Sequence, residues 1–318
     1  MPLLPADEPV SWLLKGLAFS AVSLLILSAC APAGPPTPQA NAGPIKVIAT
    51  FSIIGDFVRA VGGDKVDVTT LVGPDSDVHD FEPAPSDVAR IAAAQIIFEN
   101  GLGLETWLNP LYQASASRAR RVVVSEGVEL HATDKQNYKP GEYDPHIWQN
   151  VQLAKRMVTH IAAGLSDVDA AHAATYTANA KAYLAQLDAL DAEVLERVKT
   201  LPRDHRKLVT SHDALGYYAE RYGFTIVGDV LGSVSTEASE PSAQDMAALV
   251  GAIKAQKVKA IFLENITNPQ LVERVAQEAG VVIGPQLYTD ALGPAGSPGA
   301  TYIEAVRHNT TAIVDALK

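Results

Sequence analysis

Three histidines and one aspartate stand at places in the chain where their side chains could bind a metal ion. His79 lies in DVHDFEPAPSD, His146 in DPHIWQN, His212 at the end of KLVTSH, and Asp290 in QLYTDALGPAG. Each stands at the junction of a loop with a strand-like or helix-like run. Three imidazoles and one carboxylate are a suitable ligand set for a borderline divalent ion such as zinc. Their spacing is much wider than in a zinc finger, so on the residues alone their convergence is a hypothesis.

Acidic side chains near these positions are candidates to orient the imidazoles. Asp80 and Glu82 flank the His79 loop, and Glu264 ends the strand-like run KAIFLEN. A carboxylate or carbonyl oxygen usually holds the free ring nitrogen of a metal-binding histidine. The alternative is that Asp80 and Glu82 serve the turn in their loop, and that Glu264 caps the following helix.

The remaining histidines have simpler interpretations. Four of them lie in helix-like runs or at their edges, without neighbours that suggest a site, and we expect them to be solvated or locally bonded. These are His160, His172, His205 and His308. His131 is a candidate accessory ligand for capturing metal, and Trp148 is expected to be a packing anchor.

The elements that must position these residues alternate between strand-like and helix-like runs. Such alternation predicts an α/β fold with mostly parallel sheets, in which ligands bind beyond the carboxyl ends of strands. We expect one lobe over 45–165 and a second over 203–318. Between them, 166–202 reads as one long amphipathic helix, because apolar residues recur at intervals of three and four and no Pro or Gly interrupts the run from about 167 to 201. A rigid helix joining two lobes would resist a wide hinge motion.

The N-terminal residues indicate export and attachment to a membrane. Residues 1–29 contain one lysine before an apolar run that is too short for a comfortable transmembrane span, which is typical of a signal peptide. The run ends in LSAC, which resembles a bacterial lipobox with Cys30 as the lipidated first residue of the mature chain. Cys30 is the only cysteine, which excludes an intrachain disulfide. Residues 30–44, rich in Pro, Ala and Gly, read as a flexible tether.

The net charge of −11 argues against nucleic acid as a partner. It is compatible with collecting cations, but it is also what keeps many exported proteins soluble. We expect an extracytoplasmic monomer, held at the cell membrane by the lipid on Cys30.

From Lys46 to Leu317 the chain resembles the zinc- and manganese-binding lipoproteins of bacterial ABC metal importers, the cluster A-I substrate-binding proteins. The segments that carry this resemblance are HDFEPAPSD (79–87), NGLGLETWL (100–108), DPHIW (144–148), SHDALGYYAERYG (211–223), FLENITNP (262–269) and YTDALG (288–293). The resemblance implies a metal site between the lobes, with His79, His146, His212 and Asp290 as ligands. It also implies that the metal passes to an ABC permease and its ATPase subunit.

His212, the third of these ligand positions, bears on which metal is bound. In the family this position is histidine in many zinc binders and glutamate in many manganese binders, and imidazole in place of carboxylate suits zinc. His212 therefore favours Zn2+, with Mn2+ or Fe2+ as the alternative. The segment before DPHIW lacks the histidine run that many zinc importers carry, which keeps manganese a close second.

Two other functions are compatible with the same residues. A metallohydrolase needs an open metal position and a general base, but the chain contains no His-Glu-x-x-His motif and no Gly-x-Ser-x-Gly motif. A surface adhesin has no sequence feature of its own here. We therefore expect a binding protein and not an enzyme.

Overall fold

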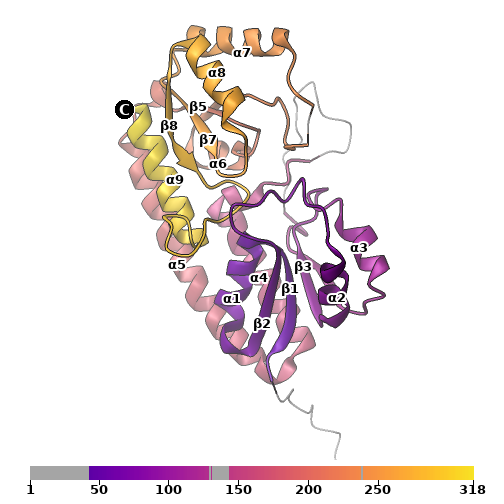
Figure 1. The fold of residues 1–318 in the computed structure, drawn as a ribbon. Coiled ribbons are helices and arrows are strands. Elements are labelled where there is room, and N and C mark those ends of the chain that lie inside the picture. The colour runs from indigo at the N-terminus through magenta and orange to yellow at the C-terminus, as the bar shows by residue number, and fades with distance from the viewer. Residues whose placement is uncertain (1–42, 129, 131–142, 238) are drawn as a thin grey trace, which may run out of the picture. The chain divides into compact units, whose positions relative to one another are not determined.

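The computed structural model describes residues 43–128, 130, 143–237 and 239–318. The predicted α/β fold is confirmed: two lobes, each built on parallel strands with helices beside them, and one long helix that runs along both (Figure 1). The predicted signal peptide, Cys30, most of the tether and His131 lie outside the described residues. Within the described part of the chain, none of the helices combines the length and apolar character needed to cross a bilayer.

The first lobe contains a four-stranded parallel sheet in the order β2-β1-β3-β4. The central strands β1 and β3 are almost wholly buried, as expected for a parallel sheet covered on both faces. The elements of this lobe are β1 (Ile45–Phe51), α1 (Ser52–Gly62), η1 (Gly63–Lys65), β2 (Val66–Val72), α2 (Pro85–Ala93), β3 (Ile96–Glu99), α3 (Leu108–Ala114), β4 (Arg120–Val123), η2 (Ile147–Gln149) and α4 (Val151–Val168).

The second lobe contains two parallel strand pairs, β5-β6 and β7-β8, with β5 lying beside β7. A cluster of buried apolar side chains packs around α7 and α8, whereas other buried residues of this lobe, such as Leu208 and Phe262, belong to the main core that continues into the first lobe. Its elements are η4 (Arg203–His205), β5 (Lys207–Thr210), α6 (Gly216–Tyr222), β6 (Thr225–Asp229), α7 (Ala243–Gln256), β7 (Ala260–Glu264), α8 (Pro269–Ala279), β8 (Val282–Leu287) and α9 (Tyr302–Leu317).

The long helix is shorter than the sequence predicts. Helix α5 spans Ala173–Lys199, and the 3-10 turn η3 (Ala170–His172) separates it from α4. The carboxylate of Asp169 accepts a 2.7 Å hydrogen bond from the Tyr176 hydroxyl, which fixes this turn. At about 1.5 Å per residue the helix is about 40 Å long, and it packs against α1 and α4 of the first lobe and against α6 and α9 of the second.

The loop that carries His79 ends at Pro85, the first residue of α2. Proline suits this position because the first helical N–H has no partner in any case. Asp87 lies inside the first turn and accepts a 2.8 Å hydrogen bond from the backbone N–H of Ala84. This cap fixes where the His79 loop joins the helix.

Candidate metal centre

The four predicted ligands come together although they lie far apart in the sequence. His79 follows β2, His212 follows β5, Asp290 follows β8, and His146 directly precedes η2. One nitrogen or oxygen atom of each residue lies within 4.8 Å of those of the other three. His146, His212 and Asp290 are fully buried, and His79 is 5% exposed. The carboxyl ends of parallel strands therefore supply three of the four side chains, as expected for this fold class.

The distances between these atoms are those of a site for one small cation. Oδ2 of Asp290 lies 3.2 Å from Nε2 of His79, 3.5 Å from Nε2 of His146 and 3.0 Å from Nε2 of His212. The Nε2 atoms of His146 and His212 are 3.3 Å apart. Four ligands arranged tetrahedrally at zinc–nitrogen bond lengths would be separated by about 3.3 Å. The side chains present could therefore hold one small divalent cation through three nitrogens and one oxygen.

A shared local motif orients two of the histidines. In Asp77-Val78-His79 and in Asp144-Pro145-His146, the backbone N–H of the histidine donates to the aspartate two residues earlier, at 2.8 and 3.0 Å. Asp144 also lies 2.7 Å from Nδ1 of His146, so its carboxylate holds the ring as well as the backbone. Sequence reasoning missed both aspartates, although the repeated Asp-x-His spacing was the signal that could have found them.

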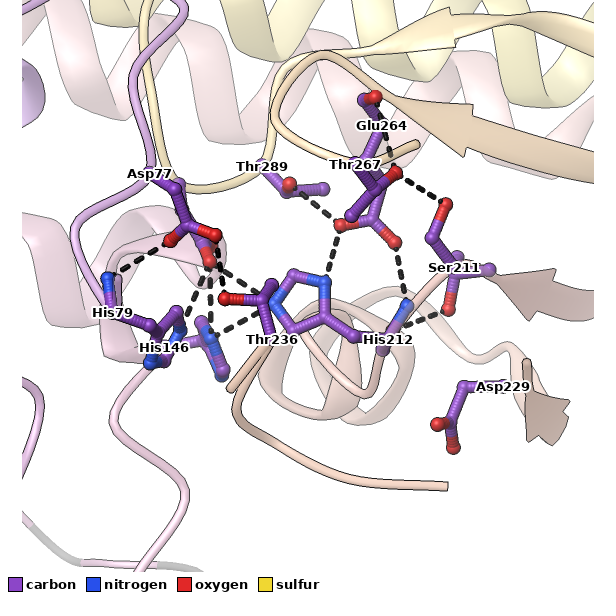
Figure 2. A network of polar contacts seen from close by, with 12 residues as sticks. Asp77, His79, His146, Ser211, His212, Asp229, Thr236, Glu264, Thr267 and Thr289 are labelled. Atoms are coloured by element: carbon purple, nitrogen blue, oxygen red, sulfur yellow. Dashed lines mark hydrogen bonds and ion pairs between the residues drawn. The ribbon is translucent and has the colours of Figure 1, made fainter. Parts of the chain in front are cut away.

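The third histidine is held by Glu264, at the end of β7. Oε1 of Glu264 accepts a 3.0 Å hydrogen bond from the backbone N–H of His212, and Oε2 lies 2.6 Å from Nδ1 of the same residue (Figure 2). The second contact is close enough for an ion pair, but Nδ1 has no hydrogen-bond partner of good geometry among the described residues. We therefore interpret it as electrostatic. Glu264 thus lies where the sequence analysis expected an orienting carboxylate.

Asp80 and Glu82 lie outside the described hydrogen-bond network of the cluster. Both are exposed, and no described hydrogen bond or ion pair joins either of them to the histidines of the cluster. Asp77 instead contacts His79 through the backbone N–H of the histidine, and the second oxygen of Asp77 accepts a 2.5 Å hydrogen bond from Thr236 of the other lobe (Figure 2). An Asp two residues before a histidine can form a local turn with its backbone, which an Asp directly after it cannot do.

Three of the remaining histidines have polar partners away from the cluster. Nδ1 of His172 lies 2.7 Å from Asp169, Nε2 of His308 lies 2.9 Å from the carbonyl oxygen of Gln286, and Nδ1 of His205 lies 3.2 Å from Lys259. His160 is half-buried in α4. None of these four belongs to the described cluster of potential metal ligands.

Trp148 is the packing anchor that the sequence suggests, and it also has a polar role. Its ring is buried and lies 5.0 Å from that of Phe51 between centroids. Its Nε1 donates a 2.8 Å hydrogen bond to the backbone carbonyl of Thr289, the residue before Asp290. The side chain of Gln149 donates to the same oxygen, also at 2.8 Å. The loop that carries Asp290 is thereby fastened to the segment that carries His146.

The charges of the buried cluster favour protonated imidazoles when no cation is bound. Burial alone would lower the pKa of His146, but the carboxylates of Asp290 and Asp144 outweigh burial and raise it to about 9. Burial likewise opposes the charged form of His212, and Glu264 and Asp290 raise its pKa well above the usual value. Burial would raise the pKa of Asp290, but His146 and His212 hold it well below its usual value. A cation that enters must replace these protons.

Comparison with known proteins places this arrangement in a family. The family described as "Zinc-uptake complex component A periplasmic" (ZnuA) matches residues 47–316. The chain belongs to this family. The ZnuA family consists of substrate-binding components of uptake systems and not of enzymes.

Individual members of the ZnuA family resemble the chain over most of its length. The manganese-binding lipoprotein MntA of Halalkalibacterium halodurans is 32% identical, over 96% of this chain and 99% of the relative. The zinc-binding protein TroA of Treponema pallidum is 36% identical, over 85% of this chain and 88% of TroA. A solved structure of TroA superposes with a TM-score of 0.79, covering 86% of this chain and 99% of that one. The iron ABC transporter lipoprotein MtsA of Streptococcus pyogenes serotype M1 is 30% identical, over 93% of this chain and 96% of the relative.

Proposed function

We propose that the protein is the extracytoplasmic receptor of an ABC importer and that it captures one divalent transition metal ion. The ion binds to His79, His146, His212 and Asp290 and is then delivered to a permease driven by its ATPase subunit. The observation that carries the proposal is the buried convergence of these four side chains, with three Nε2 atoms 3.0–3.5 Å from one carboxylate oxygen. Membership of the ZnuA family supports the same function.

Zn2+ is the preferred ion in this proposal. Three imidazole nitrogens and one oxygen at tetrahedral separations suit zinc, whereas manganese prefers more oxygen ligands. The relatives named above bind manganese, zinc or iron, so family membership is compatible with each of these ions. Mn2+ or Fe2+ is the alternative cargo, and because zinc binds more tightly at almost any such site, affinity alone does not identify the ion carried in the cell.

The location and partners follow from the same proposal. Two of the relatives named above, MntA and MtsA, are named as lipoproteins, and MtsA as one of an ABC transporter, which supports a chain held outside the cytoplasm by a lipid on Cys30. The receptor acts as a monomer whose partners are the permease, its ATPase subunit and the membrane surface.

Metal analysis of the purified protein tests the function. Protein prepared without chelators is analysed for bound elements, then stripped and titrated with zinc and manganese in competition with a chelator of known affinity. We expect one ion per chain, with zinc bound at least tenfold more tightly than manganese. Failure of the stripped protein to bind either ion would contradict the proposal, and so would turnover of ester or peptide substrates by the loaded protein.

A further inference from the structure

Thr289, the residue immediately before Asp290, forms hydrogen bonds inside the protein through its side-chain hydroxyl and its backbone carbonyl. It is fully buried, and it follows β8 at the point where the chain enters the loop that carries Asp290. Its carbonyl oxygen faces the first lobe, and its hydroxyl contacts Glu264 of the second lobe. A buried threonine in an apolar environment gains little from its hydroxyl unless the hydroxyl has a specific partner.

The carbonyl oxygen of Thr289 connects Asp290 to His146. It accepts hydrogen bonds from Trp148 and Gln149, which occupy both of its lone pairs. These donors follow His146 by two and three residues and lie in the short helix η2. Gln149 is only 4% exposed, so its side-chain amide is removed from water at this position. One carbonyl oxygen therefore links the segment that carries His146 to the loop that carries Asp290.

The hydroxyl of Thr289 connects the same loop to His212. It donates a 2.8 Å hydrogen bond to Oε2 of Glu264, the carboxylate that holds the backbone and ring of His212 (Figure 2). A buried carboxylate needs such donors, because each lone pair left without a partner carries a desolvation cost. Without the hydroxyl, Oε2 of Glu264 would keep only its contact with the imidazole, and the backbone N–H of His212 would be the remaining hydrogen-bond donor to this carboxylate among the described residues.

We propose that Thr289 is a positioning residue that couples three of the four metal ligands: His146 through its carbonyl, His212 through its hydroxyl, and Asp290 through the chain. This inference rests on the proposed metal-binding function and extends it from the ligands to the residue that sets their relative positions. Residues that orient metal ligands typically change metal affinity by 10- to 100-fold when they are altered. Thr289 acts at a distance from the ion, because it orients groups that touch the ion and does not touch it itself.

Three variants and a matched control test this role. Thr289→Val keeps the shape but removes the hydroxyl, Thr289→Ser restores the hydroxyl, and Gln149→Met removes one donor to the carbonyl. Thr310→Val is the control, because Thr310 is also a buried threonine, with its hydroxyl 3.1 Å from that of Tyr218 and outside the Thr289 network. The readouts are zinc affinity by chelator competition, the visible absorption bands of the Co2+-loaded protein, which report coordination geometry, and thermal unfolding of the metal-free protein.

We expect Thr289→Val to weaken zinc binding at least tenfold and to shift the Co2+ bands. Thr289→Ser should bind within about threefold of wild type with wild-type bands. Gln149→Met should give a smaller loss, because Trp148 still donates to the carbonyl. Thr310→Val should lower the unfolding temperature without changing zinc affinity or the Co2+ spectrum. Wild-type affinity and spectrum in Thr289→Val would overturn the coupling role alone, whereas absence of zinc binding by the wild-type protein would overturn the proposed function and this inference with it.

Discussion

Oδ2 of Asp290 lies 3.0 Å from Nε2 of His212, although 78 positions separate the two residues. The same oxygen is within 3.5 Å of the other two histidines, so the Asp290 carboxylate contacts all three imidazoles. A buried carboxylate in the middle of three imidazoles is costly to keep unless positive charge compensates it. In the metal-free protein that charge is carried by protons, and in the loaded protein by the cation.

Replacing any of the four ligands should weaken zinc binding by at least tenfold, equivalent to about 1.4 kcal/mol. His79→Ala, His146→Ala, His212→Ala and Asp290→Ala each remove one ligand from the buried cluster. We expect the largest loss for Asp290→Ala, because this carboxylate contacts every other ligand. Chelator competition measures each affinity.

The matched controls for these variants are His172→Ala and His308→Ala, whose rings have partners away from the cluster. Both should bind zinc as the wild-type protein does. A loss in His172→Ala as large as that in His79→Ala would show that the site has been assigned to the wrong residues.

His212→Glu should move the preference of the site toward manganese by adding oxygen in place of nitrogen. We expect the zinc-to-manganese affinity ratio to fall at least tenfold without reversing, since zinc starts with the higher intrinsic affinity. The new carboxylate would lie beside Glu264 and Asp290, so the metal-free variant should also be less stable than wild type. The double variant His212→Glu/Glu264→Gln should recover part of that stability. An unchanged affinity ratio would mean that position 212 does not set metal choice.

Zinc affinity should rise with pH across the range in which the buried imidazoles lose their protons. The folded pKa of His146 is about 9 without a cation, above the ordinary value of 6.5, so protons compete with zinc at neutral pH. For each proton that zinc displaces, zinc affinity should fall by up to about tenfold for every unit by which the pH is lowered. Chelator-buffered titrations at pH 6, 7 and 8 measure this slope, and a flat profile would contradict it.

The free energy of unfolding of the metal-free protein should fall as the pH becomes alkaline, whereas zinc affinity rises. Because the pKa of His146 is raised on folding, its stabilising contribution is complete below 6.5 and is lost as the pH rises through about 9. The depressed pKa of Asp290 adds stability that is present above 3.8 and is lost only well below that value. The increase in melting temperature caused by zinc should therefore be larger at pH 8 than at pH 6.

Metal binding should change the overall dimensions of the protein only slightly. Helix α5 packs on both lobes, and buried hydrogen bonds join them, including those from Trp148 and Gln149 to Thr289 and from Tyr302 to the carbonyl of Trp148. A wide hinge opening would have to break these bonds together. Solution scattering with and without zinc tests this expectation. A large compaction on binding would show that the lobes move as a clamshell.

Cys30→Ser should remove the membrane anchor. If LSAC is a lipobox, the variant should either leave the membrane fraction or keep its signal peptide, because the thiol that accepts the lipid is gone. Cell fractionation and the mass of the mature chain distinguish these results from wild-type behaviour. Unchanged processing and membrane retention would contradict lipidation at Cys30.

The sequence by itself determined the class of fold and the identity of the clustered residues. The alternation of apolar strand and helix runs is a local property, and it places His79, His212 and Asp290 in loops that follow strands. His146 was a candidate from its loop in the same way, and the family resemblance, carried by motifs such as DPHIW and YTDALG, added the implication that all four bind one metal ion. Local patterning also predicted the long helix, although not the 3-10 turn that shortens it, because the turn depends on the contact of Asp169 with Tyr176.

Only the tertiary structure decided which groups hold the ligands in place. Asp144 is only two positions from His146 in the sequence. By contrast, 52 positions separate Glu264 from His212, and 140 separate Gln149 from Thr289. The sequence offered Asp80 and Glu82 as candidates either to orient His79 or to serve the turn in its loop. Both are exposed, and the roles of Asp77 and Thr289 were overlooked. The physical reason is that hydrogen-bond partners depend on distances and directions between segments that the chain brings together only on folding. Residue types show which side chains can bind a metal, whereas the packing of the two lobes decides which other side chains orient them.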